Sequence, residues 1–507
     1  MIRLGIDVGG TNTDAVLVTD GRILKSLKAP TTEDVTTGIV AAMRGVLAGM
    51  ATPVDAVMIG TTHFVNAVVQ RRKLAPVAVI RVALPATAGL PPFTDWPDDL
   101  AACADGGSWL VEGGHDYDGR HFMPLDVAAV RTAAREIRAR GLTQAAVTAM
   151  FSPLTDEDEA QVAAILRDEV PGISVTCSNT LGGIGLLERE NAAVLNAAII
   201  PLAQDTIDGF TRAMRDVGIT APLYITQNDG TVAAAGQAAK VPVYSFASGP
   251  TNSMRGAAYL SRLQHAVVVD VGGTTSDFGH LQAGFPRQAN TAVQVGGVRT
   301  LFRMPDVLSI GLGGGSLVNP DRLTVGPSSV GYRLTTEALV FGGQQLTMTD
   351  IAVAAGLIEL GDRARVRHLP ASLVKGALAR AATMLEENVD RVKTEAADVT
   401  LLAVGGGAFL VPERLAGTST VVRVDHGNCA NAVGAAIAQV SGEVDQVFQG
   451  LTRDEALTQG RALAEQRAVE AGASADRLSL VEAEDIPIAY LPGNAIRIRV
   501  KVVGDIA

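Results

Sequence analysis

The chain opens with short apolar runs separated by turn residues. Residues 4–8 form a mostly apolar run that ends at Gly9-Gly10, and similar runs follow at 15–18 and 22–27. Runs of this length, bounded by Gly, Asn and Asp, predict β-strands joined by tight turns. We therefore expect a hairpin-like opening whose first turn is rich in Gly and Thr.

Apolar residues at helical spacing then alternate with further strand-like runs. Helices are expected at 35–47, 127–140 and 186–217, and strands at 56–59, 77–80 and 145–148. This alternation predicts a mixed α/β fold. Residues 84–120 are dense in Pro, Gly and Asp, so we expect a long loop there.

An internal repeat suggests two similar domains. Residues 7–14 and 270–277 match at six of eight positions, and each copy follows an apolar strand. A spacing this long is not that of a solenoid. We expect one domain over 1–190 with a loop insertion at about 84–120, a second over 191–440, and a small α+β appendage over 441–507. The sequence leaves open whether the C-terminal segment completes the first domain.

The repeated loops have the chemistry of a phosphate site. Adjacent glycines let backbone amides approach a phosphate, and threonines add hydroxyl donors. Asp7 and Asp270 stand at the strand ends, where a carboxylate can hold Mg²⁺ through water. One such loop is explained equally well by a plain β-turn. Two copies favour phosphate binding.

Three further segments fit this interpretation. Gly405, Gly406 and Gly407 follow an apolar strand at 401–404. Residues 431–436 predict a small-residue helix, and 191–198 predict an equivalent helix in the first half. Because small side chains let helices approach closely, we expect these two helices to form a hinge crossing.

Composition narrows the class of protein. Lys and Arg number 42 against 53 Asp and Glu, a net charge of −11, with no basic block, so we expect no nucleic-acid partner. No apolar run reaches the ~18 residues of a membrane helix, so no membrane partner is expected either. Cys103, Cys177 and Cys429 lie far apart, which predicts free thiols in a cytoplasmic protein.

The order of these motifs resembles the actin/hexokinase/Hsp70 superfamily. The corresponding segments are 7–14, 190–198, 270–277, 401–408 and 431–436. The resemblance implies two ribonuclease H-like (actin-like) domains around a nucleotide cleft, with ATP and Mg²⁺ as ligands.

Local motifs narrow the resemblance to the hydantoinase/5-oxoprolinase family, in its hydantoinase A-type subunit. They include Gly60-Thr61-Thr62, Gly113-Gly114-His115-Asp116, Ser248-Gly249-Pro250, Gly311 to Ser316, and Leu346 to Asp350. The chain departs from the family at His63, at 151–157 and at 251–253, and it lacks the larger C-terminal region that is typical of members.

This resemblance implies ATP-dependent hydrolysis of a cyclic amide such as a hydantoin, 5-oxoproline or a lactam, through phosphorylation of the ring carbonyl oxygen. A B-type subunit and a homo- or hetero-oligomer are implied as well. Asp7 would hold Mg²⁺ through water. Asp270 would orient or deprotonate the nucleophile, or share the Mg²⁺.

The implied phosphate-binding residues belong to the two loops. They are Gly9, Gly10, Thr11, Asn12, Thr13, Gly272, Gly273, Thr274 and Thr275. Gly405, Gly406 and Gly407 would contact the adenosine and the α-phosphate. The candidates for substrate contact are His63, His115, Asp116, Gly313 and Gly314. A structural loop role explains the histidines, and a plain turn the glycines, equally well.

Three other functions share these motifs. A small-molecule kinase of the sugar-kinase type would release a stable phosphorylated product. A regulatory or reactivating ATPase would respond to a protein partner. A carboxylase subunit would activate a ketone or bicarbonate. Because specificity lies in loops that the pattern does not place, the sequence does not name the substrate.

Overall fold

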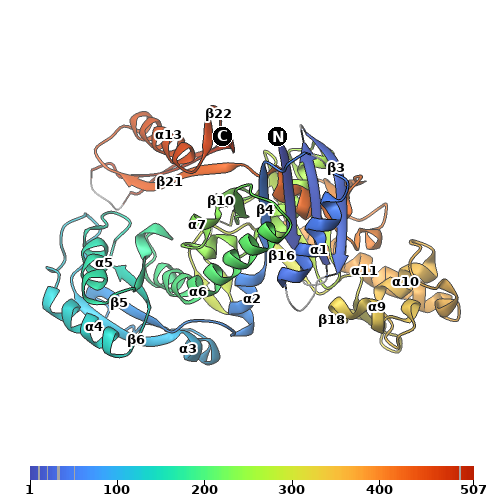
Figure 1. Ribbon diagram of the computed structural model, residues 1–507, viewed down its shortest axis with the longest axis horizontal. Coiled ribbons are helices and arrows are strands. Elements are labelled where there is room, and N and C mark those ends of the chain that lie inside the picture. The colour runs from blue at the N-terminus through green and yellow to red at the C-terminus, as the bar shows by residue number, and fades with distance from the viewer. Residues whose placement is uncertain are drawn as a thin grey trace.

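The protein has the mixed α/β fold that the sequence predicts (Figure 1). The structure is a computed structural model, and it describes residues 1–9, 12–19, 21–30, 35–50, 52–289, 291–489 and 493–506. Among these residues, no helix combines the length and the apolar character needed to cross a membrane.

The first sheet contains strands from both ends of the chain. In pairing order they are β22 (Ala473–Pro487), β23 (Ile496–Ile506), β21 (Val440–Phe448), β10 (Val232–Ala234), β9 (Leu223–Thr226), β4 (Ala56–Thr61), β1 (Ile2–Val8), β2 (Asn12–Thr19) and β3 (Arg22–Pro30). The predicted hairpin-like opening is confirmed, because β1, β2 and β3 are antiparallel neighbours.

The second sheet repeats part of this order. Its strands are β13 (Phe285–Pro286), β12 (Ser276–Gln282), β11 (Ala266–Val271), β19 (Val399–Val404) and β20 (Thr418–Arg423), and β16 (Val307–Ile310) also pairs with β12. In both sheets an antiparallel hairpin carries the repeated loop, and its first strand pairs in parallel with the next strand inward. Even the register agrees, since Asp7 pairs with Asp14 and Asp270 with Asp277.

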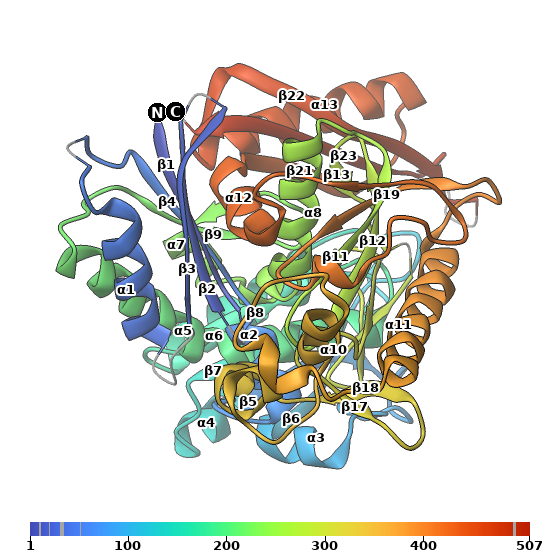
Figure 2. The ribbon, with the colours of Figure 1, turned by 90° about the vertical axis from the view of Figure 1, so that its right-hand side faces the viewer.

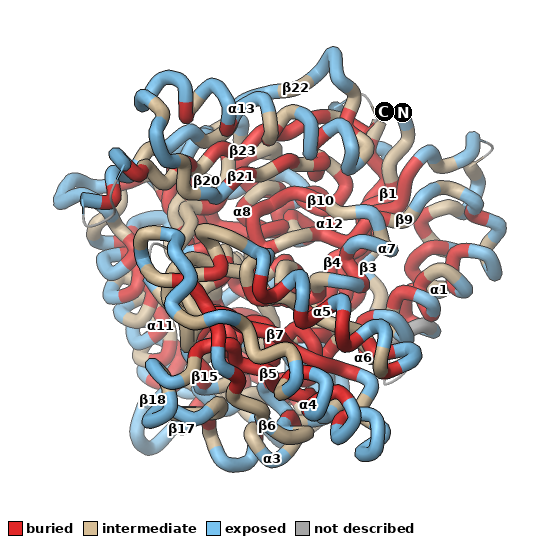
Figure 3. The backbone as a smooth tube through the Cα atoms, turned by 90° about the vertical axis from the view of Figure 1, so that its left-hand side faces the viewer, coloured by how far each residue is buried: buried red, intermediate tan, exposed pale blue. Residues whose placement is uncertain are grey.

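A third sheet is parallel throughout and lies at the left of Figure 1. Its order is β6 (Asp105–Glu112), β5 (Val77–Leu84), β7 (Gln144–Ala149) and β8 (Ser174–Cys177). Buried positions run along β5 and β7 (Figure 3). Helices α4 (Val127–Ala139) and α5 (Glu157–Glu169) supply apolar residues to the same core.

The expectation of a long loop over 84–120 is wrong in part. Residues 98–104 form helix α3 and residues 105–112 form strand β6. The glycines that predicted a loop serve the strand pairing: a Cβ on Gly106 would lie 2.9 Å from the carbonyl oxygen of Val77. Glycine within a strand marks such a close approach of another backbone.

The long helices pack on the sheets. Helix α6 (Leu186–Asp216) was predicted almost to its ends, as was α1 (Val35–Leu47), and both contribute to the core of the first sheet. Helices α10 (Met348–Ala355) and α11 (Ala371–Val392) contribute to that of the second. The shorter elements are α2 (His63–Gln70), α7 (Ala235–Ala238), α9 (Leu334–Glu337), β14 (Val293–Val295), β15 (Val298–Thr300), β17 (Ser316–Asn319) and β18 (Thr324–Ser329).

The predicted small-residue helix crossing exists, but its partner was predicted wrongly. Helix α12 (Ala430–Ile437) crosses α8 (Ser248–Ser261), not residues 191–198, which pack in α6 against the third sheet (Figure 2). A Cβ on Gly256 would lie 1.8 Å from the carbonyl oxygen of Ala430, and one on Gly434 would lie 1.9 Å from that of Asn252. Glycine is therefore required on both helices at this crossing.

The tail, where an α+β appendage was expected, forms helix α13 (Arg453–Glu470) and strands β22 and β23. These strands continue the first sheet through β21, and β9 and β10 lie in that sheet too. The expected divisions at residues 190 and 440 therefore do not coincide with the edges of the sheets.

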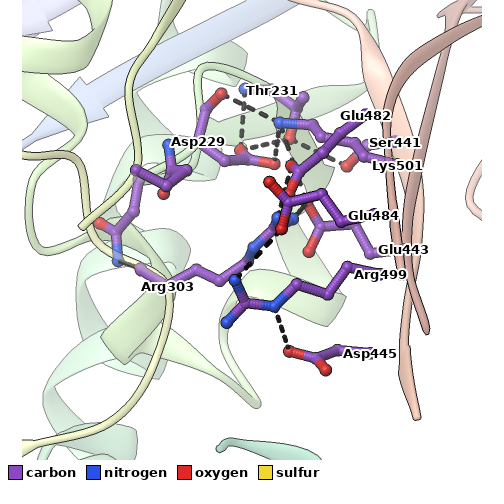
Figure 4. Close-up of polar contacts among 12 residues, drawn as sticks. Asp229, Thr231, Arg303, Ser441, Glu443, Asp445, Glu482, Glu484, Arg499 and Lys501 are labelled. Carbon is purple, nitrogen blue, oxygen red and sulfur yellow. Dashed lines mark hydrogen bonds and ion pairs between the residues drawn. The ribbon is translucent and has the colours of Figure 1, made fainter. Parts of the chain in front are cut away.

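A buried ion-pair network fixes this C-terminal segment (Figure 4). Lys501 Nζ lies 2.6 Å from Asp229 Oδ2, and the two side chains are 4% and 10% exposed. Arg303 bridges Glu443 and Glu482, with both distances 2.6 Å. The network joins β21, β22 and β23 to residues that come much earlier in the chain.

Candidate nucleotide site

The two repeated loops line one cavity. Its volume is about 210 Å³, and we call it the loop cavity. The described residues that line it are Asp7, Gly9, Asn12, Asp14, Lys28, Thr62, Gly249, Pro250, Asp270, Gly272, Gly273, Thr274, Thr275, Asp277, Gly405, Gly406, Asn428 and Asn431. Segments separated by more than 250 positions thus form a common surface.

The two loops turn in the same way. The N–H of Gly9 donates to the carbonyl of Asn12 at 3.0 Å, and the N–H of Gly272 donates to the carbonyl of Thr275 at 2.9 Å. Each turn begins two residues after the aspartate, so the aspartates occupy matching places in their hairpins. Gly10 and Thr11, two of the predicted phosphate-binding residues, lie outside the described residues.

Asp7 is buried beside the first loop, with 5% of its surface exposed. Burial raises its pKa to about 7, and the charges of Asp14 and Asp270 act in the same direction. The amide of Asn431 donates to Asp7 Oδ2 at 2.7 Å and favours the ionised form. Asp7 is thus a carboxylate that requires a nearby positive charge at neutral pH.

Asp270 has a similar environment on the second hairpin. Burial raises its pKa, and the hydroxyl of Ser253, on α8, donates to its Oδ2 and opposes that shift. Asp277, directly across the hairpin, has its pKa raised to about 6 by burial. Ser309 donates a hydrogen bond to Asp277.

The charges around the cavity fit a divalent cation. Like charges directly opposite each other on a hairpin are destabilising, yet both hairpins carry such an Asp pair. Among the described lining residues, Lys28 supplies the one positive charge, and it pairs with Asp14 at 2.7 Å. Carboxylate oxygens on both sides of the cavity are the hard donors that Mg²⁺ prefers. Asp7 and Asp270 would hold it, as the sequence suggested.

The third glycine segment closes one side of the cavity. Gly405 and Gly406 line it, directly after β19. A Cβ on Gly405, whose φ is 89°, would lie 2.1 Å from Asp270 Oδ1. Gly407 is not among the lining residues, and its N–H donates to the carbonyl of Val271 at 2.6 Å.

The other predicted residues lie around or away from this cavity. Thr13 is buried in β2 and is not among the lining residues, whereas Asn12 is. His63 begins α2 next to the lining residue Thr62, and burial lowers its pKa. Gly313 and Gly314 lie against the second loop, and the N–H of Gly314 donates to the carbonyl of Gly272 at 3.0 Å.

His115 and Asp116 lie between β6 and α4 and are absent from the lining of the loop cavity. The structure therefore does not bring His115 and Asp116 together with the two repeated loops. Their own surroundings are described below.

Sequence reasoning missed several residues that shape the cavity. They are Asp14, Lys28, Ser253, Asp277, Asn428 and Asn431. The repeat itself contains both Asp14 and Asp277, and the hairpin register that makes them face Asp7 and Asp270 could have identified them. The contacts of Ser253 and Asn431 depend on helices α8 and α12, and their positions cannot be predicted from local pattern.

A larger cavity of about 700 Å³ lies elsewhere, between residues 152–156 and the C-terminal strands. Three of its arginines are paired with carboxylates: Arg303 with Glu443, and Arg497 and Arg499 with Asp445. The fourth, Arg467, donates to the backbone carbonyl of Glu443. We assign no ligand to it.

Family sequence models match most of the chain. The hydantoinase/oxoprolinase N-terminal region matches residues 3–170, and the hydantoinase/oxoprolinase model matches residues 189–364. Similar curated proteins include the acetophenone carboxylase gamma subunit of Aromatoleum aromaticum, 27% identical over 70% of this chain and 53% of the relative. The caprolactamase subunit alpha of Pseudomonas jessenii is 26% identical over 71% and 55%. The chain spans about half the length of these relatives.

Solved structures agree on the fold. The ATP-dependent caprolactamase from Pseudomonas jessenii superposes with a TM-score of 0.79 at 19% identity, covering 99% of this chain and 87% of that one. Nucleotide-free acetone carboxylase gives a TM-score of 0.70 at 19% identity, covering 99% and 88%. Together with the family models, which match segments on both sides of the loop cavity, these similarities identify the chain as a member of the hydantoinase/oxoprolinase family.

Proposed function

We propose that this protein is an ATP-dependent enzyme that activates a cyclic amide by phosphorylating its ring carbonyl oxygen. The observation that carries the proposal is the convergence of the two repeated loops, with their paired aspartates, on one cavity. The family membership supports the amide, since relatives include a caprolactamase subunit. We further propose that the two sheets belong to two actin-like domains that close on the nucleotide.

The loops would hold the phosphates of ATP. Gly273, Thr274 and Thr275 line the cavity, where the backbone amide of Gly273 and the two threonine hydroxyls would donate to phosphate oxygens. Gly405 and Gly406 leave room for the adenosine and α-phosphate because neither has a side chain. Bound Mg²⁺ would neutralise phosphate charge and polarise the γ-phosphoryl group.

The role of Asp270 follows from the chemistry of the acceptor. An amide carbonyl oxygen has no proton to lose, so its phosphorylation requires no general base. Asp270, held by the hydroxyl of Ser253, would instead share the cation and keep the acceptor in line with the γ-phosphorus. In a kinase, where the acceptor is a hydroxyl, the same carboxylate would have to accept a proton.

The reaction balances as follows. The carbonyl oxygen forms a bond to the γ-phosphorus while the bond between that phosphorus and the β,γ-bridging oxygen breaks, which releases ADP. Water then adds to the activated ring carbon, and the ring C–N bond breaks as the nitrogen takes up a proton, which leaves an acyl phosphate. A second water attacks the acyl carbon, and the C–O bond to phosphate breaks, so phosphate leaves with the former carbonyl oxygen. Overall, a lactam, ATP and two waters give an amino acid, ADP and phosphate.

We propose that the chain acts with a B-type partner that carries out ring opening. Several relatives are described as subunits, and the chain spans about half of their length. On this division of labour, phosphorylation belongs to the present chain, and a second polypeptide receives the activated amide.

Isotope transfer tests the proposed chemistry. ATP turnover is measured with hydantoin, N-methylhydantoin, dihydrouracil, 5-oxoproline and caprolactam, and then with the most stimulating amide carrying ¹⁸O in its ring carbonyl. Label in the released phosphate supports phosphorylation of that oxygen, and the Asp270→Asn variant should lose the stimulated turnover. If the labelled amide is consumed and the released phosphate carries no label, phosphorylation of the carbonyl oxygen is excluded.

The same assay separates the alternatives. A phosphorylated small molecule that stays stable when a candidate B-type partner is present would indicate a kinase. Turnover stimulated by a protein and by none of the amides would indicate a regulatory ATPase. With a ketone added in place of the amide, ATP-dependent incorporation of bicarbonate would indicate the carboxylase chemistry that two relatives' names describe.

A further inference from the structure

A second group of polar side chains surrounds the loop that follows β6. Its backbone folds back on itself: the N–H of Asp116 donates to the carbonyl of Arg120 at 2.8 Å, and that of Phe122 donates to Gly114 at 2.9 Å. His115 and His121 form an isolated antiparallel bridge, and their ring centroids are 4.2 Å apart. The loop therefore presents two imidazoles on one side.

Close packing fixes this loop on the third sheet. Gly113 and Gly114 have φ values of 142° and 98°, a region that favours glycine. A Cβ on Gly113 would lie 2.5 Å from Val82 Cγ1, so a larger residue would push the loop off β5. The N–H of His115 donates to the carbonyl of Met150 at 3.2 Å. The position of His115 is thus set before any ligand binds.

Glu157, the first residue of α5, completes the group. Its Oε2 lies 3.8 Å from His115 Nε2 and 3.7 Å from His121 Nε2. The three candidate ligand atoms all lie within 4.8 Å of one another. The side chain of His115 is 3% exposed, whereas those of His121 and Glu157 are 49% and 63% exposed, so the group opens to solvent on one side.

Asp158 lies beside the other ring nitrogen of the buried histidine. Its Oδ2 lies 3.3 Å from His115 Nδ1 and accepts the N–H of Gly114 at 2.9 Å. A carboxylate beside Nδ1 favours the tautomer with the proton on that nitrogen, which leaves the lone pair of Nε2 directed toward Glu157. Histidines that bind metals commonly have such a second carboxylate at their other nitrogen.

We propose that His115, His121 and Glu157 bind a zinc ion. Two imidazole nitrogens and one carboxylate oxygen match the ligand set of three-residue zinc sites that keep a fourth position for water. Tetrahedral zinc with bonds of about 2.0–2.1 Å sets its ligand atoms about 3.3 Å apart. The two His–Glu spacings are 3.7 and 3.8 Å, and all three ligand atoms lie within 4.8 Å of one another, so binding would draw them together by rotation of the two exposed side chains. Imidazole ligands also disfavour Mg²⁺ and Ca²⁺.

The proposed zinc site is independent of the nucleotide. It would join the loop after β6 to the start of α5 and so hold two elements of the third sheet together. It also lies next in sequence to the larger cavity, because Asp156 lines that cavity and Glu157 follows it. Neither location involves the residues assigned to ATP.

Metal titration of the untagged full-length chain tests the site. After treatment with a chelator, wild type should bind one equivalent of Zn²⁺, and Co²⁺ in the same site should give the visible absorption typical of four-coordinate Co²⁺. His121→Ala and Glu157→Gln alter exposed side chains, so they should fold normally and bind Zn²⁺ at least tenfold more weakly. Asp158→Asn should lose about 10–100-fold in affinity.

A surface histidine provides the matched control. His368 is exposed and lies shortly before α11, and His368→Ala should bind Zn²⁺ like wild type. Zn²⁺ should raise the melting temperature of wild type and of His368→Ala, and leave that of His121→Ala unchanged. Absence of stoichiometric Zn²⁺ binding by wild type, unaltered binding by His121→Ala, or preference for Fe²⁺ over Zn²⁺ would overturn the proposal.

Discussion

The amide of Asn431 donates a hydrogen bond to the carboxylate of Asp7 at 2.7 Å across 424 positions of sequence. This contact links helix α12 to the first repeated loop. Because it favours the ionised form of a carboxylate whose pKa is raised to about 7, it prepares Asp7 to hold a cation at neutral pH.

Asn431→Ala should therefore weaken Mg·ATP binding. A hydrogen bond to a charged group contributes about 1.5–3 kcal/mol, so we expect the affinity to fall by about tenfold or more. Equilibrium titration with a fluorescent ATP analogue measures it. Asn319→Ala, at the end of β17 and outside the lining of the cavity, is the control and should bind as wild type does. Equal affinities of the two variants would contradict the role given to Asn431.

Gly405 and Gly406 offer a matched pair of substitutions. Gly405→Ala should destabilise the protein by about 1–3 kcal/mol, because the new Cβ would lie 2.1 Å from Asp270 Oδ1 and φ is 89°. Gly406→Ala meets no atom within 4 Å among the described residues and should leave stability near that of wild type. Urea unfolding compares the two, and similar losses would show that the crowding at Gly405 is misjudged.

The close crossing of α8 and α12 leads to an unusual prediction for Gly256, which lies inside helix α8. Replacing such a glycine with alanine ordinarily stabilises a helix by roughly 1 kcal/mol. Gly256→Ala should instead destabilise by several kcal/mol, since its Cβ would lie 1.8 Å from the carbonyl oxygen of Ala430. The control is Gly236→Ala in α7, where no described atom lies within 4 Å and stability should hold or rise. A stable Gly256→Ala protein would mean that the helices do not cross this closely.

The raised pKa of Asp7 predicts how the stability of the metal-free protein depends on pH. The ordinary pKa is 3.8 and the folded value is about 7, so the folded state retains a proton that the unfolded state releases. This contribution is complete below about pH 4 and is lost as the pH rises through 7, with a slope of at most about 1.4 kcal/mol per pH unit. The unfolding free energies of wild type and Asp7→Asn should therefore diverge between about pH 4 and 7, with wild type losing stability. Parallel curves would contradict the assignment.

The buried pair of Lys501 and Asp229 should matter for the C-terminal strands. Lys501→Met leaves a buried carboxylate without its partner and should cost about 3–5 kcal/mol in the free energy of unfolding. Adding Asp229→Asn removes the orphaned charge, so the double variant should recover part of the loss. A double variant that is less stable than Lys501→Met alone would show that the pair is not coupled as Figure 4 suggests.

Local pattern was sufficient to predict much of this molecule. The turn residues around Gly9 and Gly272 determine both hairpins, and apolar spacing determined α1 and α6 nearly to their ends. The partner of α12 could not be predicted, because small residues occur in α6 as well as in α8 and only the tertiary arrangement selects between them. Gly106 contributed to the wrong loop prediction for a related reason. In the sequence, a glycine that lets a neighbouring strand approach closely cannot be distinguished from a glycine in a turn.

The residues of the candidate site also fall into two groups: those that local pattern predicts and those that depend on tertiary packing. The sequence identified Asp7, Asp270 and the glycines because the repeat contains them. Asn431 and Ser253 reach those aspartates from helices that the repeat does not include. The contacts of Asn431 and Ser253 can be identified only when the packing of α8 against α12 is known.

Binding stoichiometry tests the central claim that both repeated loops serve a single nucleotide. Calorimetric titration of the chain with a non-hydrolysable ATP analogue and Mg²⁺ should give one equivalent per chain, and Asp7→Asn and Asp270→Asn should each weaken that single event. Two equivalents per chain, one for each loop, or no binding at all would contradict the account.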